Sequence, residues 1–208
     1  MKSKFLALAL MAMAFFAAGT AKAGVVLSNM GATGLTDTSG PTNTDILANN
    51  WIASGFTTGA DALQLDWVSI VGFNNDLGTK TVAIYSNNAG SPGTLIGTSS
   101  ATTVALKNVY QFNFSGVNLA ASTSYWVLPQ VGLSWYLESA NAAPTAQNAS
   151  GFSYNGVKTS SNSGSSWNTS VFNYTIGISA SPATVPEPAI TSLVCVGGIA
   201  FMRRRMKK

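Results

Sequence analysis

Short runs of β-branched and aromatic residues, separated by clusters of Ser, Thr, Asn and Gly, follow one another between Gly24 and Ala180. Apolar and polar positions alternate within several of these runs, and a helical period is absent after Gly24. Tyr110–Phe114 is the clearest example, because its three aromatic side chains alternate with Gln111 and Asn113. A strand with one buried and one solvated face has this period of two. The pattern therefore predicts an all-β body.

The expected strands are short and are spread evenly over this region. A hairpin is expected over residues 82–98, because Val82, Ile84 and Leu95 flank a loop dense in Asn, Gly and Pro. Another strand is expected within Asn118–Leu128, and the last strand is expected to pair near the first ones. The remaining strands are predicted at Val25–Leu27, Trp51–Phe56, Leu63–Phe73, Tyr110–Phe114, Trp135–Glu138, Phe152–Tyr154 and Phe172–Ser179.

Two polar segments are predicted to be loops. Gly31–Asn43 is polar and contains glycine, and Gly156–Ser170 is rich in Ser, Asn and Gly, so we expect the second segment to be mobile, with Trp167 as its one apolar contact. Alternation within Leu63–Phe73 also predicts which side chains of that strand face the core. They are Leu63, Leu65, Trp67 and Ser69.

The N-terminus has the features of a removable signal peptide. Lys2 and Lys4 precede the apolar run Phe5–Ala18, and Ala21 and Ala23 then give the small-x-small pattern that signal peptidase recognises. Residues 1–23 are therefore predicted to be a signal peptide, and the body is predicted to leave the cytoplasm.

The C-terminus contains three parts in a fixed order. After a linker at residues 181–185 come Pro186, Glu187 and Pro188, then the uncharged segment 189–202, then a basic end at 203–208 that includes Arg203, Arg204 and Arg205. An apolar segment followed by basic residues is typical of a membrane-spanning helix whose positive end stays in the cytoplasm. The segment is shorter than the roughly 20 residues that span a bilayer comfortably, which indicates a weak anchor.

This order of Pro-Glu-Pro, hydrophobic span and Arg-rich end resembles the PEP-CTERM sorting tail of exported proteins in Gram-negative bacteria. The resemblance implies that an exosortase, a membrane-embedded protease, recognises the tail and cuts it near Pro186–Pro188 after a transient stay in the inner membrane. The alternative is an ordinary C-terminal membrane anchor that is never cut.

Four stretches of the body resemble a second family, the choice-of-anchor R domain. They are Phe56–Gly59, the segment from Ile84 to Leu95 with its Gly-Ser-Pro-Gly loop, Leu119–Val127 with adjacent Tyr and Trp, and Trp135. The match covers about Trp51–Ala180. The resemblance implies an exported, jelly-roll-like antiparallel β-sandwich over residues 24–180, and it implies no established activity.

Charge excludes one class of partner. The whole chain carries a formal charge of +4, with a pI near 9.3. Between Gly24 and Thr184, however, three lysines stand against six acids, which gives −3. Because the excess of basic residues lies in the two predicted targeting segments, we expect no binding to nucleic acid. The charged residues of the body are Lys80, Lys107, Lys158, Asp37, Asp45, Asp61, Asp66, Asp76 and Glu138.

Cysteine and histidine exclude most catalytic sites. Cys195 is the only cysteine and lies in the predicted membrane segment, so the body has no disulfide, and the chain contains no histidine. Catalysis by Ser-His-Asp or Cys-His and metal sites with histidine ligands are therefore excluded. Only acids remain as candidates, and Asp61 with Asp66 is the one pair considered. Asp76 is a candidate calcium ligand, with a plain turn as the alternative. Glu138, beside two aromatic residues, is a candidate sugar-site acid, with a solvent-facing strand end as the alternative. No enzyme activity, cofactor or metal site is predicted.

Two functions of different classes remain. The first is a structural or adhesive protein of the cell surface or extracellular matrix, in exopolysaccharide or biofilm, with signal peptidase and exosortase as its processing partners. The alternative is a carbohydrate-binding module in which exposed aromatic rings stack on sugars. Its candidate residues are Trp51, Trp135, Tyr136 and Trp167, while Trp67 and Trp126 are expected in the core. Two or more of these candidate tryptophans on one solvent-facing surface favour the binding module.

Overall fold

The computed structural model describes residues 24–74, 78–148 and 150–183. These residues form strands and no helix, and all named strand pairs are antiparallel, so the all-β prediction is confirmed. No helix among them is long and apolar enough to cross a bilayer. The predicted signal peptide at 1–23, the sorting tail at 186–208 and the last two residues of the linker lie outside the described residues.

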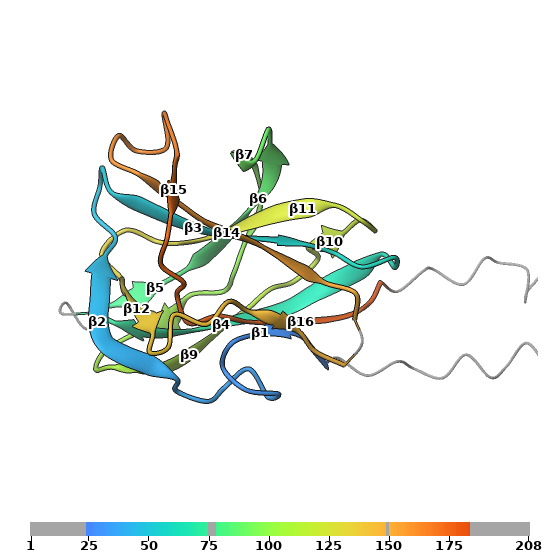
Figure 1. Cartoon of the computed structure of the whole chain (residues 1–208), viewed down its shortest axis with the longest axis horizontal. Helices are drawn as coiled ribbons and strands as arrows, with labels where there is room; N and C mark the ends of the chain where they lie inside the picture. The colour runs from blue at the N-terminus through green and yellow to red at the C-terminus, as the bar shows by residue number, and fades with distance from the viewer. Residues whose placement is uncertain (1–23, 75–77, 149, 184–208) are drawn as a thin grey trace, which may run out of the picture.

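The strands form two facing layers (Figure 1). Sheet A contains β13 (Thr145–Ala146), β1 (Gly24–Ser28), β16 (Gly177–Pro182), β4 (Leu63–Phe73), β12 (Ser134–Glu138), β2 (Ser39–Asp45), β9 (Asn108–Asn113) and β10 (Asn118–Leu119). Sheet B contains, in order, β15 (Asn168–Ser170), β14 (Ser153–Ser160), β3 (Trp51–Thr57), β11 (Ser124–Pro129), β6 (Val82–Asn88) and β7 (Ser91–Thr98). A small third pair joins β5 (Thr79–Lys80) and β8 (Thr102–Thr103).

The core lies between the two sheets and is apolar. Phe56 stacks on Phe152 with ring centroids 5.9 Å apart, and Tyr125 lies 5.7 Å from Phe56 on the neighbouring strand. Each large side chain that is fully buried contributes roughly 1.5–3 kcal/mol, so a body without cysteine can be stable on packing alone. The largest of these side chains are Trp135, Phe56, Phe112, Leu27, Ile46, Ile52, Leu65, Ile70, Ile84 and Leu119.

The hairpin predicted over residues 82–98 is confirmed as β6 and β7. Its turn residues Ala89 and Gly90 have φ angles of 49° and 82°, which suit the tight turns that join twisted antiparallel strands. The last strand pairs as expected, because β16 lies between β1 and β4, but it runs from Gly177 to Pro182 and includes only the last three residues of the predicted Phe172–Ser179.

The predicted core face of β4 is only half right. Leu63 and Leu65 do face the core, but beyond them Val68 and Ile70 face it, and Trp67 and Ser69 do not. The cause is a β-bulge: Ser179 of β16 pairs with Trp67 and Ala180 pairs with Leu65, so Asp66 has no partner on that side. One extra residue moves every later side chain to the opposite face.

The loop between β1 and β2 covers the outer face of sheet A. Met30 is fully buried there, and the Ser69 hydroxyl donates to the carbonyl of Gly34. Gly34 has φ +65°, and a Cβ at this position would lie 3.1 Å from the Trp67 ring. Trp67 is therefore half-buried against this loop rather than in the core that we predicted for it.

Both predicted loops are partly strand. Ser39–Asn43 belongs to β2, an edge strand that pairs only with β12 and has mostly exposed polar residues, so no apolar alternation marked it. Within Gly156–Ser170, the residues 156–160 continue β14 and the residues 168–170 form β15, which together make a hairpin. Pairing with β3 supplies the hydrogen bonds that the composition could not indicate.

Candidate functional site

The outer face of sheet B carries a second apolar cluster. On β3, Ile52 and Phe56 face the core, so Trp51 and Ala53 lie on the opposite side of the sheet. We call this surface the aromatic face. It has a buried floor of Ala53, Trp126 and Leu128, against which the half-buried Trp51, Tyr85 and Trp167 pack.

Trp126 forms the floor because its neighbour across the sheet is a glycine. Trp126 pairs in register with Gly55, and a Cβ at position 55 would lie 2.8 Å from the indole ring. The indole N–H donates to Asn87 Oδ1 at 2.9 Å, and only 1% of the residue is exposed. Trp126 is thus buried, as predicted, although outside the central core, and it supports the aromatic face without presenting a surface of its own.

Trp51 and Trp167 lie next to each other on this face. Their ring centroids are 6.5 Å apart and their planes are inclined by 53°. The Trp51 indole N–H donates to Ala48 O at 3.1 Å, and Gly164 of the β14–β15 loop packs close to the Trp51 ring. Two predicted candidates therefore share one surface, which is the arrangement that favours a binding module.

A groove of about 220 Å³ runs beside Trp51. Its wall is mostly apolar, and polar side chains stand at its rim. The Gln130 side-chain oxygen accepts from Thr81 N at 3.0 Å and from Thr81 Oγ1 at 3.1 Å, so the amide nitrogen of Gln130 is the half left for a ligand. The principal lining residues are Trp51, Tyr85, Leu95, Thr98, Leu128 and Gln130.

Trp135 is not part of this surface, and its prediction as a sugar-binding residue is wrong. Its side chain is fully buried in the core, 5.1 Å from the ring of Tyr174. The indole N–H donates to Thr175 O at 2.7 Å. Because β12 lies in sheet A and Trp135 faces the core, its ring has no face open to a ligand.

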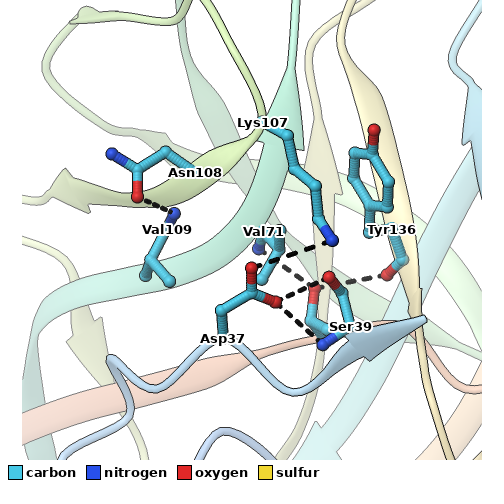
Figure 2. A network of polar contacts seen from close by, with 8 residues as sticks. Asp37, Ser39, Val71, Lys107, Asn108, Val109 and Tyr136 are labelled. Carbon is cyan, nitrogen blue, oxygen red and sulfur yellow. Dashed lines mark hydrogen bonds and ion pairs between the residues drawn. The ribbon is translucent and has the colours of Figure 1, made fainter. Parts of the chain in front are cut away.

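Tyr136 is half-buried on the outer side of sheet A and is separated from the aromatic face by the whole sandwich. The Lys107 ammonium lies 4.8 Å from the centre of its ring and 3.8 Å from Asp37 Oδ2 (Figure 2). Burial acts to raise the pKa of Asp37, but hydrogen bonds from Ser39 and the Lys107 charge outweigh it and the pKa is lowered. The ring face of Tyr136 is thus already occupied by a cation.

Glu138 is neither a sugar-site acid nor a solvent-facing strand end. Only 7% of the residue is exposed, and its Oε2 accepts from Ala140 N at 2.9 Å and from Ala142 N at 2.6 Å. The carboxylate therefore closes the turn after β12. No group of three or more residues able to hold a metal occurs in the described part of the chain.

The other acids are dispersed. Asp61 is exposed in the connection between β3 and β4, whereas Asp66 sits in the bulge and accepts from Ser181 Oγ at 2.8 Å. Asp76, the predicted turn ligand, lies outside the described residues. The described acids therefore do not line a common cavity with an aromatic wall.

A larger cavity of about 390 Å³ lies at the start of β1 and near the end of β16, and Asp61 contributes to its wall. Its amide and hydroxyl groups are used within the protein, because Asn148 Nδ2 donates to Val25 O at 2.9 Å and Ser150 Oγ donates to Val26 O at 2.6 Å. These contacts hold β1 in place, so we take the groove beside Trp51 as the candidate site.

Sequence reasoning selected Trp51 and Trp167 as aromatic residues within a longer set, and it did not select Tyr85, Leu128 or Gln130. Tyr85 follows the core residue Ile84, so its outward direction was available from the pattern. No protein-family model matches this chain, and a comparison with curated proteins finds no match.

Proposed function

We propose that this chain is an exported, non-catalytic adhesive protein that binds polysaccharide through the groove and the aromatic face of sheet B. The observation that supports this most directly is the pair Trp51 and Trp167 on one surface, beside Tyr85 and a groove. Aromatic rings offer an apolar plane with a polar edge, which matches the C–H faces and hydroxyl groups of sugar rings. The polar rim at Gln130, Thr81 and Thr98 suits hydrogen bonds to those hydroxyl groups.

The size of the groove favours a polymer over a small ligand. At about 220 Å³ it is smaller than the roughly 300–1,000 Å³ typical of sites that enclose a small molecule. A polymer needs only a few of its rings to contact an open surface, since the rest of the chain continues into solvent. We therefore propose extracellular polysaccharide as the partner.

The position of the groove also suits surface display. Gly24 pairs with Ala180, and Ala183 N donates to Ala62 O, so both ends of the described body lie at the end of the sandwich where β3 runs into β4 (Figure 1). Trp51 lies at the opposite end of β3, six residues from Thr57, which is about 20 Å. A body attached through its C-terminal tail would hold the groove away from the attachment point.

We further propose that the chain is sorted as the resemblance to PEP-CTERM tails implies, from a transient inner-membrane precursor to the cell surface or extracellular matrix of a Gram-negative bacterium. Strands along the chain alternate between the sheets from β3 in sheet B to β4 in sheet A and β6 in sheet B, which supports a jelly-roll-like connectivity. A purely structural matrix role without a ligand is the second candidate, and the body's low charge favours it.

Trp51→Ala and Trp167→Ala are each expected to weaken polysaccharide binding about tenfold, because each removes one stacking ring. The measurement is binding of the mature protein from its host to a panel of immobilised polysaccharides, with thermal unfolding as a check of the fold. Trp67→Ala is the matched control, since Trp67 is half-buried on the other sheet, and it should bind as the wild type does. Unchanged binding by both tryptophan variants would reject the proposed site, and retention in the matrix without any glycan binding would favour the structural role.

Terminal processing gives a separate expected result. The intact mass of surface or matrix protein should correspond to a chain that lacks residues 1–23 and everything that follows a cut shortly after Pro188. Alanines at Pro186, Glu187 and Pro188 should leave the body folded and retain the protein at the inner membrane. Peptides that contain Arg203–Lys208 on surface-exposed protein would instead indicate an uncut anchor.

A further inference from the structure

The charges of the body are distributed unequally between the two sheets. None of the strands of sheet B contains an acid, although Lys158 lies on β14. The acids that the structure describes lie elsewhere, on sheet A or in connections. They are Asp45, Asp66 and Glu138 in strands of sheet A, Asp37 in the loop before β2, and Asp61 in the loop after β3.

Lys80 lies next to residues that line the groove, although its own side chain is not part of the wall. It is half-buried on β5, and its Nζ donates to the carbonyl of Val131 at 3.4 Å. Val131 and its neighbour Gln130 line the groove, as does Thr81, the residue after Lys80. The ammonium group is therefore held by the backbone that forms the rim.

Lys158 flanks the aromatic face on the side of Trp51 and Trp167. It pairs in register with Ala53, a residue of the buried floor, so its side chain lies on the outer face of sheet B. Its Nζ donates to the hydroxyl of Thr169 on β15 at 2.8 Å. Lys80 thus lies beside the rim of the groove, and Lys158 lies beside the floor of the aromatic face.

Within the described part of the chain, neither lysine has a carboxylate partner. The ion pair found there joins Lys107 to Asp37, on the opposite side of the sandwich. The hydrogen bonds of Lys80 and Lys158 go to neutral oxygens, so no carboxylate of the described residues neutralises their charge. An anionic polymer is attracted to such a surface, and the acids on sheet A favour approach from the side of sheet B.

We propose that the ligand is an acidic polysaccharide whose negatively charged groups contact Lys80 and Lys158 while its sugar rings stack on Trp51 and Trp167. This inference rests on the proposed function and specifies its ligand class. Stacking supplies binding to the sugar rings, and the two ammonium groups distinguish charged from uncharged polymers.

The test compares two polymers with the same backbone, polygalacturonate and its fully methyl-esterified form, because esterification removes the negative charge at the cost of one added methyl group per sugar. The mature protein is expected to bind polygalacturonate at least tenfold more tightly at 50 mM NaCl. At 500 mM NaCl this preference should shrink, since salt screens exposed charges. Dextran sulfate in place of polygalacturonate shows whether sulfate serves as well as carboxylate.

The double variant Lys80→Gln with Lys158→Gln is expected to lose most of the preference while it keeps its affinity for the esterified polymer. Lys107→Gln is the control for each of the single variants Lys80→Gln and Lys158→Gln, because it also removes one positive charge but at a distant, paired site, and it should leave the preference unchanged. Trp51→Ala should weaken binding to both polymers.

The outcomes separate the two proposals. Equal binding of the charged and esterified polymers by the wild type would overturn the inference and leave the proposed function in place. An equal loss in Lys107→Gln would also overturn it, because attraction would then come from net charge. Tighter binding of single-stranded DNA than of any polysaccharide would overturn it in favour of nucleic acid, and absence of binding to every polysaccharide would overturn both proposals.

Discussion

Trp135→Ala is expected to lower the free energy of unfolding by about 3–5 kcal/mol, the range typical of a buried tryptophan replaced by alanine. The ring is fully buried between the sheets and packs against Tyr174. Its removal leaves a cavity and also leaves the carbonyl of Thr175 without the indole N–H that donates to it at 2.7 Å. Chemical denaturation of the mature protein, followed by fluorescence and circular dichroism, measures the change.

The adjacent Tyr136→Ala is the matched control, because Tyr136 is half-buried on the outer side of the same strand. It removes a cation–π contact with Lys107 and should cost about 1 kcal/mol. Trp135→Phe should fall between the two, since it keeps most of the packing and loses the hydrogen bond. If Trp135→Ala costs no more than Tyr136→Ala, the placement of Trp135 in the core is wrong.

Unfolding is expected to become markedly easier between pH 10 and pH 12, and Tyr154 is expected to account for much of the change. Burial raises the pKa of Tyr154 from 10.0 to about 12, and a contact with Ser54 offsets only part of this effect. Between these pH values the unfolded chain releases the phenolic proton and the folded chain keeps it, so stability falls as pH rises. Below pH 10 the ionisation of Tyr154 costs almost no stability, and by pH 12 it costs about 2 kcal/mol.

Tyr154→Phe provides the control for this pH dependence. The variant loses the hydrogen bond from the tyrosine hydroxyl to Asn173 Oδ1 at 2.8 Å, so it should be about 1 kcal/mol less stable near neutral pH. Its stability should then decline less steeply from pH 10 to pH 12. Burial also raises the pKa of Tyr174, so Tyr174 lowers the stability of both proteins in the same direction over this pH range. Parallel curves for the variant and the wild type would exclude Tyr154 as the responsible group.

The proposed site uses the side of sheet B that the core does not need. Each strand of a sandwich presents one row of side chains to the other sheet and a second row outward. On β3 and β11 the outward row is aromatic and apolar where solvent would ordinarily favour polar groups. A surface of this kind beside a groove indicates binding, and the charges around it indicate which polymers it binds.

The candidate site could be predicted only in part from the sequence. Four aromatic residues were selected, and the structure brings two of them together on the aromatic face, buries Trp135 and places Tyr136 on the other sheet. Alternation predicts that neighbours such as Trp135 and Tyr136 point in opposite directions, but it does not say which of them faces the core. That choice depends on which side of β12 the other sheet covers.

The sequence by itself determined that the body is all-β, that it lacks disulfides and histidine chemistry, and that its charge is mildly acidic, because composition and a period of two are local properties of the chain. Tertiary structure decided the bulge at Asp66, the pairing of polar strands such as β2 and β15, and the meeting of Trp51 with Trp167. These features depend on pairing between strands far apart in the chain, as in Gly24 with Ala180. Local alternation carries no information about such partners, so only the assembled sheets show which outward rows form a surface together.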